Sequence, residues 1–244
     1  MDAPEGQPPP FLEPLLGIVF DLDGTLVLSD HDFRRMRREV IRLAETAGVA
    51  PGRLNPDQTI VEIVSSALTE LEGQGVPEGT RFRFEADVNR TIDAIELEAL
   101  PKTTAREGAA ELLGALTRRG FRLGVLTRSS SEFCRTALQK TGLLDFFPYL
   151  RTRSAPGPAK PDPEALRLLL REMGIPVDRS LLVGDHRFDA ECAVRASVRF
   201  YGILPPDGGE PDAAERFRAN GASAVARDLP ELGRFLDVAV VPAG

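Results

Sequence analysis

The sequence lacks the features of membrane-spanning, secreted and disulfide-stabilised proteins. None of the apolar runs in its 244 residues is long enough to cross a membrane. The N-terminal stretch has neither a positive flank nor an apolar segment, so no signal peptide is expected, and residues 1–14 are predicted to form a flexible, proline-rich tail. Cys134 and Cys192 are too few for a disulfide framework and lack the spacing of metal ligands. A cytoplasmic protein is therefore predicted.

Positive charge is also scarce. The chain has 30 Lys and Arg against 37 Asp and Glu, which gives a net charge of −7. Because binding to a nucleic-acid backbone needs a basic face, nucleic acid is not an expected partner, and neither is a membrane. A local basic pocket for a small phosphorylated metabolite remains compatible with this charge. The sequence leaves the oligomeric state open.

Short apolar runs alternate with helical patterns over most of the chain. The runs predict strands at residues 15–20, 121–127, 149–152, 180–183, 198–203 and 222–226. Predicted helices span about 104–120, 131–141 and 162–174, and two more end near 196 and 236; the first opens on a capping-box pattern at Thr104. Strands that alternate with helices indicate right-handed crossovers and a mostly parallel sheet. The expected fold class is therefore α/β, with a Rossmann-like core.

Residues 30–100 interrupt this alternation, because they show helical periodicity and no convincing strand. The first helical face in this segment consists of Phe33, Met36, Val40, Leu43, Ala44 and Ala47. Further helices are expected near 56–71 and 80–100. The simplest interpretation is an α-helical cap domain at 30–100, inserted into a core domain made of 15–29 and 101–244.

Four short polar motifs follow the predicted strands or open the helices after them. They are Asp21 to Thr25 after the first strand, Thr127 at the end of the second, Lys160 before a helix, and Gly184 to Asp189 after the 180–183 strand. Open parallel sheets bind their ligands at the carboxyl ends of the strands. Each motif alone is a weak signal, but all four in this order indicate one catalytic site.

Together these motifs resemble those of the haloacid dehalogenase (HAD) superfamily, specifically its phosphatases with a helical cap inserted after the first motif. The resemblance covers the chain from Leu15 to about Leu236, and it implies a strand order of five-four-one-two-three. By resemblance, the site has a nucleophile at Asp21, a general acid/base at Asp23, phosphate-binding groups at Thr127 and Lys160, and acidic metal ligands at Asp185 and Asp189.

Elementary chemistry supports these roles independently. A carboxylate such as Asp21 can attack phosphorus and form an acyl phosphate that water later cleaves. Its approach to a dianion requires positive charge, which Mg²⁺ supplies through oxygen ligands. The side chains of Asp21 and Asp185 and the main-chain carbonyl of Asp23 suit this ion. Asp189 can bind a metal-bound water or hold Lys160.

Four further residues are candidates for substrate binding. Gly24 lets the backbone turn sharply after Asp23. Arg128 stands where such phosphatases often have Asn, so it is either a substrate contact or a solvated loop residue. Arg34 and Arg38, one helical turn apart in the cap, could grip an anionic group, or they could form a solvated helix face. His186, which follows Asp185 where a small hydroxyl residue is frequent, is expected beside the metal rather than bound to it.

The predicted function is magnesium-dependent hydrolysis of a small organic phosphate monoester, of the phosphoglycolate or sugar-phosphate kind, through an aspartyl-phosphate. A phosphomutase of the β-phosphoglucomutase type and a non-catalytic phospho-ligand-binding protein remain alternatives. Within this superfamily, 2-haloacid dehalogenase activity is disfavoured, because that chemistry does without the second aspartate and Asp23 is present here. A phosphonatase would need a cap lysine, and there is none between Asp30 and Leu100.

Overall fold

The structure is a computed structural model that describes residues 14–237, so almost all of the predicted N-terminal tail lies outside the described residues. The chain divides into two compact units. One, called the core unit here, contains the residues up to Ser29 and those from Thr103 onward, and the other, the cap unit, is Asp30–Lys102. Within the described range, no helix combines the length and apolar character needed to cross a membrane.

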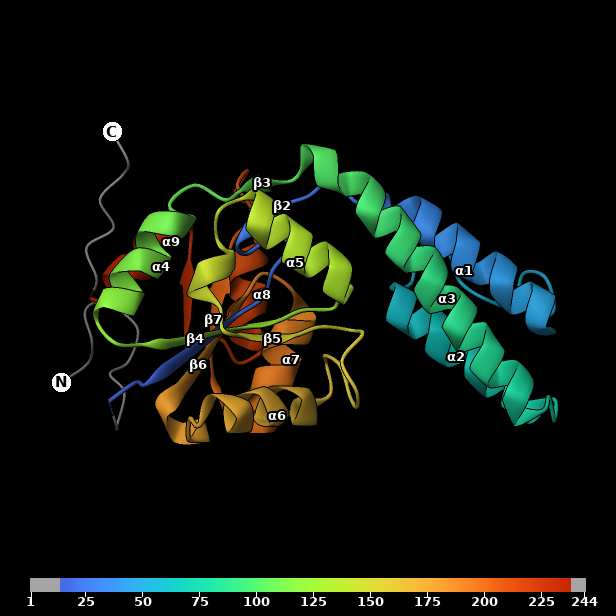
Figure 1. The fold of residues 1–244 in the computed structure, drawn as a ribbon. Helices are drawn as coiled ribbons and strands as arrows, with labels where there is room; N and C mark the ends of the chain where they lie inside the picture. The colour runs from blue at the N-terminus through green and yellow to red at the C-terminus, as the bar shows by residue number, and fades with distance from the viewer. Residues whose placement is uncertain (1–13, 238–244) are drawn as a thin grey trace. The chain divides into compact units, whose positions relative to one another are not determined.

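The core unit is built from strands that alternate with helices (Figure 1). In chain order its elements are β1 (Gly17–Phe20), β2 (Val27–Leu28), β3 (Thr104–Ala105), α4 (Ala109–Arg118), β4 (Arg122–Leu126), α5 (Ser131–Lys140), η2 (Leu144–Phe146), β5 (Tyr149–Arg151), α6 (Pro163–Met173), η3 (Val177–Arg179), β6 (Ser180–Gly184), α7 (Arg187–Ala196), β7 (Arg199–Ile203), α8 (Ala213–Ala219), β8 (Ala224–Ala226) and α9 (Leu229–Phe235).

Six of these strands form one parallel sheet in the order β5-β4-β1-β6-β7-β8. If its strands are numbered along the chain, the order is three-two-one-four-five-six, which reads six-five-four-one-two-three from the opposite edge of the sheet. The predicted order of the first five is therefore confirmed, and β8 is added beside β7. Strand β1 is apolar and fully buried, and it lies between β4 and β6. An apolar sequence of this kind suits a central strand whose two faces are both covered.

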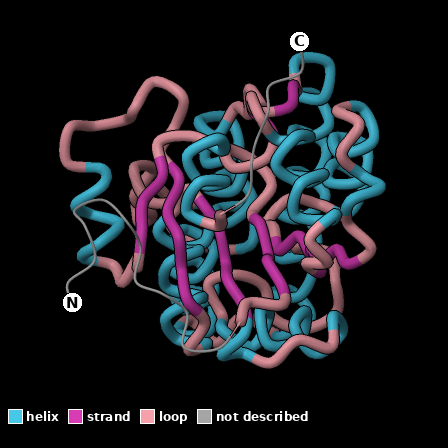
Figure 2. The backbone as a smooth tube through the Cα atoms, turned by 90° about the vertical axis from the view of Figure 1, so that its left-hand side faces the viewer, coloured by secondary structure: helices cyan, strands magenta, loops and turns pink. Residues whose placement is uncertain are grey.

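Helices cover both faces of the sheet, and Figure 2 shows the strands between these layers. On one face α6, α7 and α8 pack in a single apolar cluster, in which Leu169, Ala193 and Phe217 join Val19 and Phe200 of the sheet. Contacts among α4, α5, η2 and α9 form the layer on the other face. Two covered faces leave the strand ends as the part of the sheet that a ligand can reach.

The carboxyl ends of β4, β1 and β6 lie side by side at the point where the strand order reverses. The ladder continues just past these strands. The N–H of Asp21 donates to the carbonyl of Val183 at 2.8 Å, and the N–H of Thr127 donates to that of Arg151 at 3.0 Å. Such a switch point is where open α/β sheets bind ligands. The residues that directly follow β1, β4 and β6 are therefore held at one edge.

The helix predicted to begin near Thr104 is wrong at its start. Thr104–Ala105 instead form β3, which pairs antiparallel with β2, Val27–Leu28. Helix α4 begins only at Ala109, after Gly108 with a φ of 78° and no side-chain cap. The Thr-x-x-Glu pattern describes local geometry only, and here the backbone bonds to β2 outweigh it.

The cap unit is entirely helical in the part described, with α1 (Phe33–Ala47), α2 (Ile60–Gly73), α3 (Glu78–Ala99) and the short η1 (Leu100–Lys102). Thr59 and Glu62 form a complete capping box on α2. One face of α1 buries Met36, Val40 and Ala44 against α2 and α3. Phe33, which was predicted to share that face, is 49% exposed and packs against His31, because it begins the helix and lies beyond the three-helix core.

The cap core predicts a stability difference between two apolar residues of α3. Ile92→Ala should lower the free energy of unfolding by about 2–4 kcal/mol, because Ile92 is 3% exposed and its loss leaves a cavity. Phe82→Ala, which removes a larger side chain that is 72% exposed, should change it by less than about 0.5 kcal/mol. Urea denaturation followed by circular dichroism measures both. Equal losses would mean that α3 does not pack through Ile92.

Candidate active site

A buried lysine lies between two carboxylates at the carboxyl edge of the sheet. Lys160 is 2% exposed, and its Nζ lies 2.7 Å from Oδ1 of Asp21 and 2.6 Å from Oδ1 of Asp189. Burial alone would lower the pKa of Lys160, but the charges of Asp189 and Asp21 outweigh it and raise that pKa above its usual range. Lys160 is therefore a fixed positive charge beside Asp21.

Helix α7 holds Asp189 rigidly. The side chain of Asp189 is fully buried, and its two oxygens have different partners. Oδ1 accepts a hydrogen bond from Lys160, and Oδ2 accepts one from the N–H of His186 at 3.1 Å. Burial, and then the charge of Asp21, raise the pKa of Asp189 to about 7. Both oxygens of Asp189 are thus already engaged.

Asp185, which follows β6, is held by the turn after β1. The hydroxyl of Thr25 donates to its Oδ1 at 2.6 Å. Gly24 has a φ of 83°, and a Cβ at this position would lie 2.2 Å from Oδ2 of Asp185. Glycine is therefore required there for both conformation and space. Burial, and then the charges of Asp21 and Asp189, raise the pKa of Asp185 well above its usual value.

These carboxylates fit a divalent cation. Within the described residues, Asp21, Asp185 and Asp189 offer oxygens that lie within 4.8 Å of one another. The three carboxylates have one ammonium beside them, Lys160, which pairs with Asp21 and Asp189. Burial, and then the charges of neighbouring carboxylates, raise the pKa values of Asp185 and Asp189. Oxygen donors of this type are those that Mg²⁺ prefers. Because Asp189 already bonds Lys160 and His186, Asp21 and Asp185 are the better placed side-chain ligands. Asp23 was predicted to contribute its main-chain carbonyl, and that role stays a prediction.

Thr127 and Arg128 follow β4, next to β1 in the sheet. Thr127 is 3% exposed, and its Oγ1 accepts the N–H of Ser129 at 3.1 Å. That bond leaves the hydroxyl proton of Thr127 to be donated elsewhere. Arg128 donates to the main-chain carbonyl of Lys160. The predicted substrate contact of Arg128 therefore has a second possible role, which is to fix the segment that carries Lys160.

The cap candidates Arg34 and Arg38 belong to α1 and are exposed. Neither forms an ion pair within the range 14–237, whereas Arg42 on the same helix lies 2.9 Å from Glu39. Unpaired arginines remain available to an anionic group from outside the helix. Their role as substrate contacts stays a prediction.

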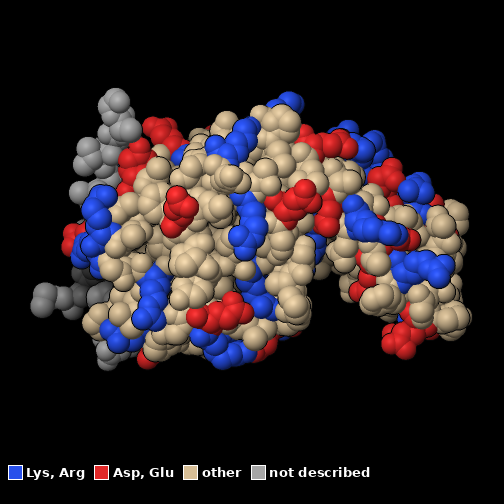
Figure 3. All heavy atoms as spheres, in the orientation of Figure 1, with Lys and Arg blue, Asp and Glu red and all other residues tan. Residues whose placement is uncertain are grey.

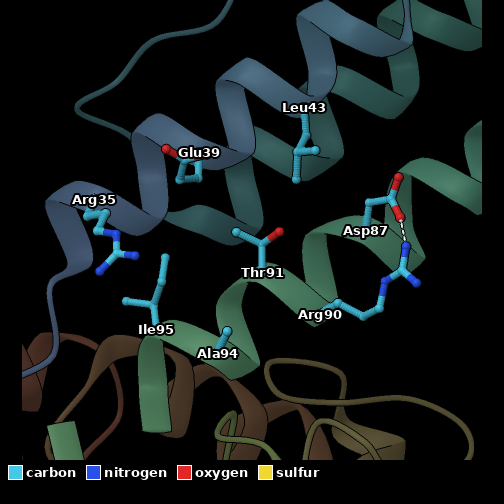
Figure 4. A pocket seen from close by; sticks show the side chains of 8 residues that line it. All are labelled: Arg35, Glu39, Leu43, Asp87, Arg90, Thr91, Ala94 and Ile95. Carbon is cyan, nitrogen blue, oxygen red and sulfur yellow. Dashed lines mark hydrogen bonds and ion pairs between the residues drawn. The ribbon is translucent and has the colours of Figure 1, made fainter. Parts of the chain in front are cut away.

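A shallow groove between α1 and α3 of the cap unit is a different feature (Figure 4). It is lined by Arg35, Glu39, Leu43, Asp87, Arg90, Thr91, Ala94 and Ile95. Its two arginines are already neutralised, since Arg35 lies 2.6 Å from Glu98 and Arg90 pairs with Asp87. The groove therefore presents little free charge to an anion, and neither predicted cap arginine lines it.

The sequence motifs missed three contacts that shape the site. Thr25 on Asp185 could have been suspected, because it directly follows Gly24. His186 caps α7 through Nδ1, which accepts the N–H of Phe188 at 3.2 Å. Arg106, at the end of β3, donates to the main-chain carbonyl of Gly24, and no local sequence pattern indicates that contact.

Family comparison agrees with this geometry. Residues 15–197 match the family model described as haloacid dehalogenase-like hydrolase. The chain belongs to this family. The family and the class of enzyme expected from the four motifs, a hydrolase on an α/β core, are thereby confirmed.

Three relatives indicate the breadth of this similarity. The phosphoglycolate phosphatase of Rhodospirillum rubrum is 28% identical over 234 residues, which cover 90% of each chain. The N-acetylmuramic acid 6-phosphate phosphatase of Pseudomonas aeruginosa is 26% identical over 79% of this chain and 85% of its own. The crystal structure of a HAD family hydrolase from Deinococcus radiodurans R1, with bound phosphate and sodium, superposes with a TM-score of 0.61. It covers 94% of this chain and 99% of its own at 23% identity, a likeness of fold.

The crowded carboxylates predict an unusual dependence of stability on pH. The pKa of Asp189 is about 7 when folded, against 3.8 for the ordinary group, so its stabilising contribution is full below about pH 3.8 and is lost as pH rises through about 7. The pKa of Asp185 is raised as well, by burial and then by the charges of Asp21 and Asp189, so ionised Asp185 also destabilises the fold. In chelator, Asp185→Asn should therefore melt at a higher temperature than wild type, and the difference should grow from about pH 5.5 to about pH 8.5. Mg²⁺ should raise the melting temperature of wild type and should not raise that of Asp185→Asn.

Asp178→Asn is the matched control, because Asp178 is exposed and precedes the same strand, β6, at its opposite end. It should melt like wild type at every pH and keep its response to Mg²⁺. If Asp185→Asn melts lower than wild type at high pH, repulsion does not dominate the cluster.

Proposed function

We propose that this chain is a magnesium-dependent phosphatase of small organic phosphate monoesters, which works through an aspartyl-phosphate on Asp21. The observation that carries the proposal is the contact of 2.7 Å between the Asp21 carboxylate and the buried Lys160 ammonium. A phosphate ester is anionic and repels a bare carboxylate, so a fixed cation beside the attacking oxygen is what this chemistry requires. Membership of the hydrolase family supports the same reaction.

The reaction has two steps on Asp21. Its carboxylate attacks phosphorus and expels the alcohol, and water then cleaves the acyl phosphate. Lys160 holds phosphoryl oxygens by charge, and the hydroxyl of Thr127 donates a hydrogen bond to them. Asp21 and Asp185, with the main-chain carbonyl of Asp23, would hold Mg²⁺. When bound, the ion neutralises charge on the transferring phosphoryl group.

Asp23 is the proposed general acid and base. It follows Asp21 by two residues, and Gly24 turns the backbone directly after it. In the first step Asp23 gives a proton to the leaving oxygen, and in the second it takes one from the attacking water. Asp189 acts indirectly, because its Oδ1 holds the Lys160 ammonium at 2.6 Å.

The proposed substrate class is set by what the relatives have in common. The Rhodospirillum relative is named for phosphoglycolate and the Pseudomonas relative for a phosphorylated amino sugar, at nearly equal identity to this chain. Both names refer to small phosphate monoesters, so we extend this class of substrate to the present chain without choosing one compound. Figure 3 shows Lys and Arg interspersed with Asp and Glu on the face drawn, a surface that suits a small anion better than a polyanion.

A panel of phosphorylated metabolites, assayed with Mg²⁺ and with chelator, tests the proposal. Wild type should release phosphate from at least one small monoester, and chelator should abolish the release. Asp21→Asn should lose roughly a thousandfold or more in kcat while remaining folded, because an amide cannot attack phosphorus. Asp178→Asn should keep wild-type activity.

The same panel separates the alternatives. A phosphomutase would move phosphate within a sugar phosphate and release little, and a non-catalytic binder would turn over nothing in either condition. Asp21→Asn activity within about tenfold of wild type would rule out the covalent mechanism.

Specificity is proposed to reside in the cap domain at residues 30–100, with helix α1 supplying an anion grip and closure excluding water from the reaction. Arg34→Ala and Arg38→Ala should raise KM about tenfold for a substrate with a second anionic group and change kcat less, since that grip acts in binding. Hydrolysis of a small generic ester should be nearly unaffected. Arg42→Ala, whose arginine is already paired with Glu39, is the control and should leave both KM values unchanged.

Equal effects on both esters, or no effect on either, would assign Arg34 and Arg38 to a solvated helix face. In that case the cap must recognise its substrate through other residues.

A further inference from the structure

Arg106 is a buried arginine of the core unit that lies outside the four catalytic motifs. Arg106 directly follows β3 and is 4% exposed. Its guanidinium donates to the main-chain carbonyls of Gly24 at 2.6 Å, of Leu204, and of Arg227 at 3.3 Å. Among the described residues, no carboxylate lies at hydrogen-bond distance from this guanidinium, and its acceptors are three carbonyls. Burying a charged arginine in this way costs free energy, so a role in stability alone is a poor explanation for it.

The three carbonyls belong to segments that are far apart in the sequence. Leu204 follows β7 and Arg227 follows β8, while Gly24 lies in the turn after Asp23. The N–H of Arg106 also donates to the carbonyl of Leu26 at 2.9 Å, so both its main chain and its side chain bond the same turn. Arg106 thus ties the catalytic turn to the ends of β7 and β8.

The same turn is held from the acidic cluster as well. Thr25 donates to Asp185 at 2.6 Å, and Gly24 approaches that carboxylate so closely that no Cβ fits. The peptide between Gly24 and Thr25 therefore has the Arg106 guanidinium bonded to its carbonyl and the Asp185 carboxylate bonded to the next side chain. Burial lowers the pKa of Arg106, and Asp185 and then Asp228 raise it, but an arginine stays charged throughout the working range of pH.

We infer that Arg106 is a positioning residue, which fixes the Asp23–Gly24–Thr25 turn so that Asp23 and Asp185 keep the geometry that the reaction needs; this rests on the proposed function. A general acid must lie within hydrogen-bond reach of the leaving oxygen. A displacement of about 1 Å in a reacting group can cost about a hundredfold in rate. The segment that returns from the cap unit therefore carries, four residues after Lys102, the side chain that braces the catalytic turn.

Arg106→Met and Arg106→Lys test this inference, and Arg122→Met and Arg122→Lys, at an exposed arginine, are the controls. Arg122 also donates to main-chain carbonyls, those of Met173 at 2.8 Å and Gly174 at 3.1 Å, but it begins β4 at the opposite edge of the sheet. All four variants are compared with wild type at a temperature where circular dichroism reports a folded protein. The measurements are kcat and KM for a small generic ester at saturating Mg²⁺, and amide hydrogen exchange of the peptide covering residues 22–28.

Arg106→Met should lower kcat at least about tenfold with KM within about twofold, because the loss affects the reacting geometry more than binding. Its 22–28 peptide should exchange faster. Arg106→Lys should fall between, since an ammonium can bond one or two of the carbonyls but not all three in a fork. Both Arg122 variants should match wild type in kcat and in exchange of that peptide.

Folded Arg106 variants with kcat within about twofold of wild type would overturn the inference, whatever their melting temperature, because a merely structural arginine would change stability alone. If Arg106→Met does not fold, Arg106→Lys decides by the same criterion. If wild type hydrolyses no ester, the proposed function fails instead. Hydrogen exchange then still decides whether Arg106 holds the turn, and unchanged exchange would refute that as well.

Discussion

The contact of Lys160 with Asp21 and Asp189 is the interaction on which the rest of the site depends. Three carboxylates with oxygens within 4.8 Å of one another would repel strongly, and the full burial of Asp189 adds the cost of removing its charge from water. Lys160 offsets part of this, with both ion pairs shorter than 2.8 Å. Burial, and then the charge of Asp21, still raise the pKa of Asp189 to about 7, so the cluster is suited to an added cation. Burial and charge repulsion in this cluster therefore cost stability, as is common at functional sites.

The topology of the sheet explains how such distant residues meet. Asp21 and Asp185 are 164 positions apart, yet each follows one of two neighbouring parallel strands, β1 and β6. Parallel pairing in this register puts the ends of both strands at the same level, and the reversal of strand order beside β1 leaves space there. Lys160 comes from the segment just before α6 and Asp189 from the first turn of α7, two helices that pack on the same face. The order of the strands therefore brings these four residues together.

Most of the fold could be predicted from sequence because its signals are local. Buried strands such as β1 and β6 are short apolar runs, and the motif residues follow them directly. Thr104 was misassigned because its pattern fits a helix start, whereas pairing with β2 across the chain decides its conformation. Arg106 could not be found in this way, since its contact with Gly24 spans 82 positions and follows no periodicity. Long-range hydrogen bonds of single side chains leave no trace in a local pattern.

The departures from the common phosphatase pattern concern the same ion-paired lysine. His186 replaces a small hydroxyl residue, but its Nδ1 accepts the N–H of Phe188 as a capping hydroxyl oxygen would. That bond requires a lone pair on Nδ1, so the ring proton of the neutral imidazole lies on Nε2. The N–H of His186 meanwhile donates to Asp189, which holds Lys160. Arg128, where Asn is frequent, donates to the carbonyl of Lys160 itself. Arg128 therefore fixes the main chain of Lys160, and His186 fixes Asp189, the carboxylate that pairs with the Lys160 ammonium. Neither contact requires these two residues to touch a substrate.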